Sequence, residues 1–367
     1  MKILFISNIP TPYRHYFFEE LNKKIDIKVA YLSKTELGRN WDYNKICNPK
    51  YSLFLETKQF VYKRLSFYIA KNYKQIIDEY NPSIIIMAGS WNYPSTMQLI
   101  FNKKYRKDIK VGFWSEGNFI DETYSKNYFL KKLKKTVYNS FDFFLTPGKE
   151  SDKLVNHYAK NKNIIRLTNV AVPQYYNPKN RDLTKPLEIC IISRLMERKN
   201  VFGYIKAVKG LLLENKIKIN ILGDGIQKDE IKKYINKQNL KNINLLGEVE
   251  PNCVKDYIIE SDILCLPSFR DPYPLTLIEA MFLSKPLLVS QTVGSVPEVI
   301  HNNGLIFNPN SSKEMYDRTL EYLSFDSKKM HELAENSQSI GKTKFEPSVV
   351  IQNLVNDLKK VQLETNN

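Results

Sequence analysis

Two carboxylates and the start of a helix lie close together in the segment 262–281. An apolar run ends at Ser268, a proline-rich turn containing Asp271 follows, and an apolar helical pattern containing Glu279 begins near Leu275. Free N–H groups and the dipole at a helix start attract phosphates, and carboxylates accept hydrogen bonds from hydroxyl groups. The segment therefore predicts a site for a ligand with both phosphates and sugar hydroxyls. An ordinary strand–turn–helix with two surface acids is the alternative.

Two cations follow an earlier apolar run. Arg194 and Lys199 lie in the stretch Ile192–Asn200, which leads from the run 187–194 into a helical pattern. A guanidinium binds phosphate oxygens through paired N–H groups, and an ammonium adds a compact positive charge. Cations at such a place are commonly solvated. Beside the acidic segment, however, they predict a diphosphate site that stabilises a departing nucleoside diphosphate.

Short apolar runs alternate with helix-period stretches along the whole chain, which is typical of βα units and parallel sheets. Helix-period stretches in the first half include Phe60–Tyr80 and Lys126–Phe141. The apolar runs predict strands near 2–7, 28–33, 83–89, 111–116, 143–147, 187–194, 217–223, 243–247, 263–267, 286–290 and 305–307. Ligands of such sheets bind at the carboxyl ends of the strands.

A linker rich in proline and polar residues, 172–186, separates two halves of similar size. The chain of 367 residues is long for one domain and suits two. We predict an α/β protein with one domain over residues 1–175 and a second over 186–344.

The segment 262–281 resembles the signature of family 4 retaining glycosyltransferases, in which seven residues separate two glutamates and an Ala-Met pair follows the second. Glu279 followed by Ala280-Met281 matches the second glutamate, and Asp271 replaces the first with a side chain one methylene shorter. The stretch with Arg194 and Lys199 is similar to the family element that clamps the donor diphosphate. The resemblance implies a GT-B fold, with two Rossmann-like domains whose parallel sheets face each other across a cleft.

The resemblance extends in order over most of residues 187–309. It implies that a C-terminal helix, at about 345–367, packs back on the first domain. It implies catalytic roles for Arg194, Lys199 and Asp271. The donor-binding residues that it implies are Arg194, Lys199, Gly223, Val249, Pro274, Leu275 and Glu279.

Candidates for acceptor binding lie in the first half. A loop at the predicted cleft edge contains Thr11, Tyr13, Arg14 and His15, and it either closes over diphosphate and acceptor or is only a turn. Glu116 ends another run at this edge, near the place where many family members carry a histidine. A carboxylate there could orient the acceptor hydroxyl or take up its proton as a catalytic group. A structural role for Glu116 is equally open.

Positive charge is concentrated in the first half. Residues 1–185 contain 32 Lys and Arg against 16 Asp and Glu, whereas residues 186–367 contain 23 of each. This excess suggests an anionic partner. The helical pattern Lys126–Tyr138 combines apolar residues with four lysines that are predicted to face the anionic inner leaflet of a membrane, Lys131, Lys132, Lys134 and Lys135. The alternative is a core-packed helix with a solvated lysine face.

Several classes are disfavoured by composition. No apolar run reaches the roughly 18–20 residues of a membrane span, and the first residues lack a signal peptide. We expect a cytoplasmic protein, peripheral on the inner membrane face. The four cysteines lack metal or redox spacing and no Asp-x-Asp element occurs, so we expect neither metal nor cofactor.

The resemblance implies a retaining glycosyltransferase, and the sequence predicts that it works without a metal ion. It would move a sugar from a nucleoside diphosphate sugar, with a UDP-sugar expected, to a glycan or lipid-linked acceptor in cell-surface polysaccharide synthesis. Two alternatives stay open. One is a non-catalytic, basic membrane- or nucleic-acid-binding protein on a degenerate transferase fold, although the neutral second half does not favour nucleic acid. The other is a GT-B-type nucleotide-sugar epimerase, which needs no acceptor.

Overall fold

The chain forms two compact units. The computed structural model describes residues 1–36, 42–62, 65–102, 108–122, 127–178 and 182–363. Unit 1 contains Met1–Val172 together with the C-terminal segment Pro347–Asn367, and unit 2 contains Pro173–Glu346. The predicted domains were 1–175 with a helix at about 345–367, and 186–344. The predicted linker thus belongs to unit 2, while Lys126 and residues 364–367 lie outside the described part.

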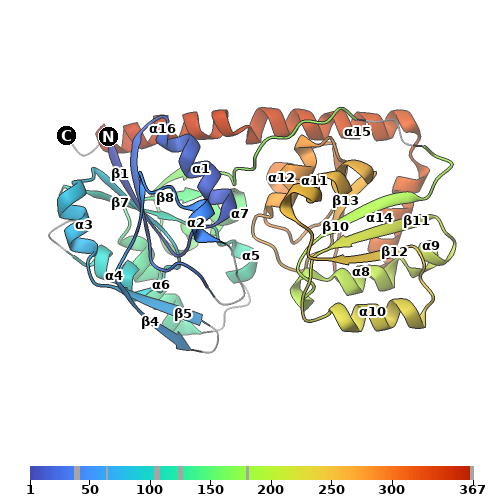
Figure 1. Cartoon of the computed structure of the whole chain (residues 1–367), viewed down its shortest axis with the longest axis horizontal. Helices are drawn as coiled ribbons and strands as arrows, with labels where there is room; N and C mark the ends of the chain where they lie inside the picture. Colours follow the sequence, from blue (N-terminus) through green and yellow to red (C-terminus); the bar gives the residue numbers. More distant parts are fainter. Residues whose placement is uncertain (37–41, 63–64, 103–107, 123–126, 179–181, 364–367) are drawn as a thin grey trace. The chain divides into compact units, whose positions relative to one another are not determined.

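Unit 1 is built around a parallel sheet of seven strands in the order β3-β2-β1-β6-β7-β8-β9 (Figure 1). The strands are β1 (Lys2–Ser7), β2 (Asp26–Tyr31), β3 (Ser52–Phe54), β6 (Ile84–Ala88), β7 (Lys110–Trp114), β8 (Phe143–Thr146) and β9 (Asn163–Arg166). The helices are α1 (Pro12–Asn22), α2 (Tyr43–Ile46), α3 (Tyr73–Tyr80), α4 (Pro94–Ile100), α5 (Phe119–Glu122), α6 (Tyr128–Asn139), α7 (Lys149–Tyr158) and α16 (Pro347–Leu363).

The central strands of unit 1 are buried on both faces, which explains why their sequences are almost continuously apolar. Every residue of β6 is buried. Leu354 and Leu358 of α16 belong to the same apolar core as Phe17 and Leu21 of α1. Helix α16 therefore completes the unit that the first residues begin.

The prediction of a helix over Phe60–Tyr80 is wrong for most of its length. The chain forms an antiparallel hairpin of β4 (Thr57–Tyr62) and β5 (Leu65–Ala70), and only Tyr73–Tyr80 is helical. Tyr68 and Ala70 of β5 are buried. This alternating burial follows the two-residue period of a strand, and it outweighs the weaker helical spacing in the sequence.

Unit 2 contains a parallel sheet of six strands in the order β12-β11-β10-β13-β14-β15 (Figure 1). The strands are β10 (Leu187–Ile192), β11 (Ile217–Leu222), β12 (Ile243–Gly247), β13 (Ile263–Leu266), β14 (Leu287–Ser290) and β15 (Gly304–Phe307). The helices are α8 (Val201–Ala207), α9 (Lys209–Leu213), α10 (Lys228–Lys237), α11 (Pro251–Glu260), α12 (Leu275–Phe282), α13 (Val296–Val299), α14 (Ser312–Ser324) and α15 (Ser327–Ile340). A 3-10 turn, η1 (Glu197–Lys199), follows β10, and a π-helical turn, η2 (Gly341–Phe345), follows α15.

Candidate functional site

The two predicted charged motifs of unit 2 meet at one edge of its sheet. β10 and β13 are neighbouring parallel strands, so the loops after their carboxyl ends lie next to each other. Lys199, which follows β10, forms an ion pair with Asp271, which follows β13. The structure therefore joins two residues that are 72 positions apart in the sequence.

Backbone contacts fix the loops that carry this ion pair. The Arg270 N–H donates to the carbonyl of Arg198 at 3.2 Å, and Nη1 of Arg198 donates to the carbonyl of Arg270 at 3.1 Å. The Gly294 N–H donates to the carbonyl of Asp271 at 2.9 Å. Since three loops are tied together, the charges at this edge are held in place before any ligand arrives.

Lys199 and Asp271 are mostly shielded from solvent, with side chains 12% and 10% exposed. Burial lowers the pKa of Lys199, the charges of Arg198 and Arg194 act in the same direction, and the Asp271 carboxylate opposes them. Arg194 itself is exposed at the same edge. An anion arriving here would meet one shielded and one exposed cation and would favour the protonated form of Lys199.

Glu279 lies in α12, whose buried residues Leu277, Ile278 and Met281 anchor the helix against the core. Burial raises the pKa of Glu279. Within the described chain its carboxylate has no hydrogen-bond partner from the protein. A shielded carboxylate without a partner is unfavourable unless a ligand supplies hydrogen-bond donors, so Glu279 is suited to bind hydroxyl groups.

The other predicted donor residues follow the ends of neighbouring strands. Pro274 caps α12 and Leu275 is its first residue, so the free N–H groups of that helix begin beside the turn of Asp271. Val249 is half-buried and follows β12. Gly223 follows β11 with φ +129°, and an added Cβ would lie 2.1 Å from the carbonyl oxygen of Ser193. Only glycine fits this close approach of two loops.

Unit 1 has its own ion pair at the carboxyl ends of its central strands. Nη2 of Arg14 lies 3.0 Å from Oε1 of Glu116, which follows β7. Nη1 of Arg14 donates to Oγ of Ser7 at 2.8 Å and to the carbonyl of Ala88 at 3.0 Å. Burial opposes the charge on Arg14, but the Glu116 carboxylate and the nearby Tyr13 and Tyr31 together outweigh it, and the pKa of Arg14 is raised.

The predicted acceptor loop needs correction. Tyr13, Arg14 and His15 belong to helix α1, and Thr11 precedes its first residue. Arg14 is buried, and its guanidinium pairs with Glu116. The same group also packs on Trp114, at 4.6 Å from the ring centre. His15 lies 3.6 Å from Glu19 on the same helix and does not line the cavity of unit 1.

A cavity of about 380 Å³ opens beside the Arg14–Glu116 pair. Such a volume, with aromatic walls and a few polar groups, is typical of sites for small organic ligands. Three of the predicted acceptor residues contribute to it. Its lining includes Asn8, Thr11, Tyr13, Arg14, Trp91, Trp114, Glu116, Lys134 and Tyr138.

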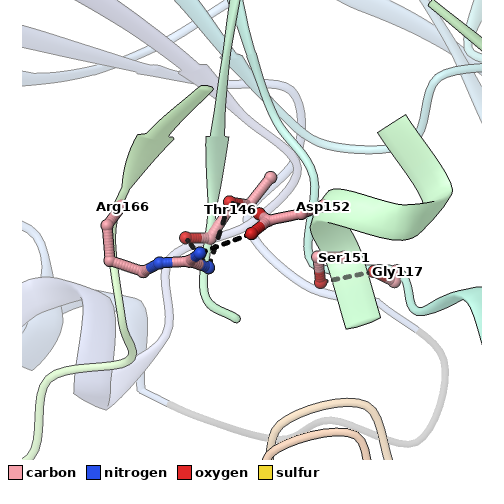
Figure 2. Close-up of polar contacts among 5 residues, drawn as sticks. All are labelled: Gly117, Thr146, Ser151, Asp152 and Arg166. Atoms are coloured by element: carbon pink, nitrogen blue, oxygen red, sulfur yellow. Dashed lines mark hydrogen bonds and ion pairs between the residues drawn. The ribbon is translucent and has the colours of Figure 1, made fainter. Parts of the chain in front are cut away.

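A polar cluster supports the loop that carries Glu116 (Figure 2). Oγ of Ser151, in the first turn of α7, donates to the carbonyl of Gly117 at 2.6 Å. Asp152, next in that turn, accepts from Oγ1 of Thr146 at 2.6 Å and pairs with Arg166 at 2.5 Å. These contacts tie α7 to the ends of β8 and β9, and Ser151 ties the Glu116 loop to α7.

The prediction that Lys134 faces a membrane is wrong. Lys134 is buried, pairs with Glu122 at 2.5 Å and lies 4.7 Å from the ring centre of Tyr158. Glu122 is in turn bonded by the hydroxyl of Tyr158. Lys132 and Lys135 are exposed and Lys131 is half-exposed. The register of α6 thus turns one of the four lysines toward the interior.

Sequence reasoning did not find Trp91, Lys134 or Tyr138 as cavity residues. None of the three lies in the predicted acceptor loop or next to Glu116 in the sequence. The packing of α6 beside the loop after β6 brings them to Glu116. The signal that could have found Lys134 is its helical spacing with buried Tyr138.

No group of three or more His, Cys, Asp or Glu residues in the described chain is arranged to hold a metal ion. Among the same residues, none of the helices is both long and apolar enough to span a bilayer.

Two parallel sheets in two Rossmann-like units are the architecture of the GT-B class. A solved structure of Anabaena HepE in complex with UDP has a TM-score of 0.78 and 15% identity, and the match covers 98% of this chain and all of that one. This likeness establishes the fold.

Residues 176–340 match the family model "Glycosyl transferases group 1". An uncharacterized glycosyltransferase of Methanocaldococcus jannaschii is 25% identical over 57% of this chain and 60% of its own length. The poly(ribitol-phosphate) alpha-N-acetylglucosaminyltransferase of Staphylococcus aureus is 22% identical over 69% of this chain and 50% of its own length. The chain thus spans about half to three fifths of the length of these relatives.

Proposed function

We propose that this protein is a retaining glycosyltransferase that transfers a sugar from a nucleoside diphosphate sugar, a UDP-sugar, to a hydroxyl group of a glycan or lipid-linked acceptor in cell-surface polysaccharide synthesis. The observation that carries the proposal is the Lys199–Asp271 pair at the strand ends of unit 2, together with the shielded carboxylate of Glu279 in helix α12, which follows the turn of Asp271. The UDP bound to Anabaena HepE and the polymer acceptor named for the S. aureus relative are consistent with it.

Different residues bind the diphosphate, the ribose and the transferred sugar of the donor. Arg194, Lys199 and the N–H groups at the start of α12 bind the diphosphate, because all three present positive charge or hydrogen-bond donors. Glu279 accepts hydrogen bonds from ribose hydroxyls. Asp271 accepts from the transferred sugar and orients Lys199 through their ion pair.

The reaction breaks the bond between C1 of the sugar and the phosphate oxygen, and the electron pair leaves with the nucleoside diphosphate. The acceptor oxygen forms the new bond to C1 on the same face, and its proton passes to the departing phosphate oxygen. Lys199 and Arg194 stabilise the charge that develops on the leaving group. Glu116 orients the acceptor hydroxyl and is itself held by Arg14.

No metal ion has a role in this proposal. The sequence has no Asp-x-Asp element, and the cations Arg194 and Lys199 supply the charge that a metal would otherwise bring. The acceptor is proposed to be lipid-linked, which would place the enzyme at the inner face of the cytoplasmic membrane. Nucleic acid is not among the proposed partners.

A nucleotide-sugar panel tests the donor. The full chain is heated with UDP-, GDP-, ADP- and TDP-sugars, and a UDP-sugar at 100 times its dissociation constant is expected to stabilise by about 2.7 kcal/mol. Glu279→Ala should remove the shift. An unchanged melting temperature with every nucleotide sugar would contradict the proposal.

Product analysis tests the reaction. With the donor and a glycan acceptor in the presence of EDTA, we expect a glycoside whose anomeric proton coupling matches that of the donor sugar. Conversion of the nucleotide sugar without any acceptor would indicate an epimerase instead. Loss of activity in EDTA that returns with added metal would contradict metal independence.

A further inference from the structure

The N-terminal end of α6 presents apolar side chains to solvent. Tyr128 is 71% exposed, Phe129 81%, Leu130 48% and Leu133 39%. Val137, nearer the other end of the helix, is fully buried. The apolar residues of α6 are therefore divided between the surface and the core of unit 1, and most of them lie on the surface. Clusters of exposed apolar residues mark interaction surfaces.

Three lysines surround this apolar end. Lys131, Lys132 and Lys135 alternate with the exposed apolar residues, and within the described part of the chain none of the three forms an ion pair. Lys134, by contrast, is neutralised by Glu122 in the interior. The outer surface of α6 therefore combines three lysines that form no ion pair in the described chain with four exposed apolar side chains.

We propose that this surface of α6 (Tyr128, Phe129, Leu130, Lys131, Lys132, Leu133 and Lys135) docks on a bilayer that contains anionic lipid. The aromatic and leucine side chains would enter the boundary between headgroups and acyl chains, and the lysines would pair with anionic headgroups. A second copy of the chain fits less well. A symmetric dimer through this surface would bring the lysines of both copies together without carboxylates to compensate them.

The inner side of α6 connects the docking surface with the proposed acceptor site. Lys134 and Tyr138 line the 380 Å³ cavity that we propose as the acceptor site. A helix with its side chains is about 10–12 Å across, so docking brings the cavity to about one helix diameter from the lipid headgroups. This part of the argument rests on the proposed function, because it takes the cavity as an acceptor site. An acceptor carried on a lipid would then reach the cavity without leaving the membrane.

Vesicle flotation tests the docking. The full chain is mixed with phosphatidylcholine vesicles, with or without 30 mol% phosphatidylglycerol. We expect it to float with the anionic vesicles and to remain in solution with the neutral ones. The double variant Phe129→Ser/Leu130→Ser should lower the bound fraction at least tenfold. Leu213→Ser, at an apolar residue of unit 2 that is 56% exposed, is the matched control and should float as the unchanged protein does.

Charge variants test the electrostatic part. Lys132→Glu/Lys135→Glu should weaken partition into anionic vesicles by at least about fivefold for each lysine, which corresponds to about 1 kcal/mol each. Lys232→Glu/Lys233→Glu on α10 changes the net charge equally on an exposed surface of unit 2 and should have little effect. Equal loss in both double variants would overturn the proposal, because binding would then follow net charge alone.

Two further results would overturn the proposal, and one measurement separates it from the proposed function. Equal flotation with neutral and anionic vesicles would exclude the anionic-lipid surface. Light scattering that shows a dimer, which Phe129→Ser/Leu130→Ser dissociates, would assign the surface to a second copy. Transfer to a water-soluble acceptor reports on the proposed activity without any membrane, so flotation and transfer can fail independently.

Discussion

Both units hold an ion pair at the carboxyl ends of their central strands, but the two pairs differ in what surrounds the cation. In unit 1 the guanidinium of Arg14 binds Glu116, Ser7 and Ala88 and lies on the ring of Trp114. In unit 2 the ammonium of Lys199 has three donors, and one of them meets Asp271.

The difference indicates two kinds of charged site. Arg14 connects three strand ends of unit 1 and fixes the position of Glu116. Lys199 pairs with Asp271 and lies near Arg194, and its remaining donors can bind a ligand. A cation held by several protein groups contributes to structure, and one held by a single carboxylate has donors left for binding. The variants below separate these roles.

Arg14→Met is expected to have the largest effect, on stability. It removes a buried cation and leaves Glu116 without its partner, which costs about 3–5 kcal/mol. Hydrogen exchange should show the loss of protection in β1, β6 and β7, whereas the strands of unit 2 stay protected. The control is Arg166→Met, whose side chain is 42% exposed and which should cost less than about 1 kcal/mol. If hydrogen exchange in Arg14→Met were unchanged, the Arg14–Glu116 pair would have no larger structural role than the Lys199–Asp271 pair.

Lys199→Met is expected to act on catalysis. The loss of a cation that stabilises the leaving group should lower kcat by about 10²–10³-fold, while the protein remains folded. Lys218→Met, which breaks an exposed pair with Glu188 in the same sheet, should change kcat by less than about threefold. Steady-state rates at saturating donor measure both. A similar rate for Lys199→Met and the unchanged protein would show that this cation does not stabilise the leaving group.

The sequence predicted unit 2 better than unit 1. All six strands of unit 2 were predicted within a few residues, because each is a short apolar run followed by glycine, proline or a polar residue. Lys199, Asp271 and Glu279 were found because each lies in a continuous motif close to a strand end. Their ion pair follows from the order of the strands, which the motif spacing alone does not contain.

In unit 1 the sequence failed where long-range packing decides the outcome. The hairpin of β4 and β5 was predicted as helix because its aromatic residues also satisfy a helical period. Lys134 was predicted to face outward because four lysines in one helix suggest a solvated face. Its burial depends on Glu122, 12 residues away, and on a neighbouring tyrosine of α7, contacts that no local pattern contains.

Glu279→Gln is expected to weaken donor binding more moderately. The amide keeps the shape of the side chain but loses the charge that accepts hydrogen bonds from ribose hydroxyls. This costs about 1.5–3 kcal/mol, or a 10–100-fold higher KM for the donor. Glu230→Gln on the exposed side of α10 is the control. If kcat fell by the same factor and the KM for the donor stayed unchanged, Glu279 would lie at the reacting sugar and not at the nucleoside.

The smallest expected effect is a pH-dependent difference in stability. Because burial raises the pKa of Glu279, the folded protein binds its proton more tightly than the unfolded chain does. Stability therefore falls as pH rises from the ordinary glutamate value of about 4.3 through the raised pKa, and it is constant above that. Without ligand, Glu279→Gln should be more stable than the unchanged protein at pH 7–8, and this advantage should disappear at pH 4. Denaturant titrations at both pH values measure the free energy of unfolding of the two proteins. If Glu279→Gln were more stable by the same amount at both pH values, the raised pKa of Glu279 would be contradicted.

Helix α16 has a consequence for how the protein forms during translation. Unit 2 is inserted into unit 1, so 174 residues, Pro173–Glu346, are synthesised between Val172 and the helix that covers α1. At 5–20 residues per second a ribosome needs about 9–35 s for this stretch. During that interval Phe17 and Leu21 lack the apolar partners that Leu354 and Leu358 later provide. The nascent first unit is thus a candidate client for chaperones until the last helix emerges.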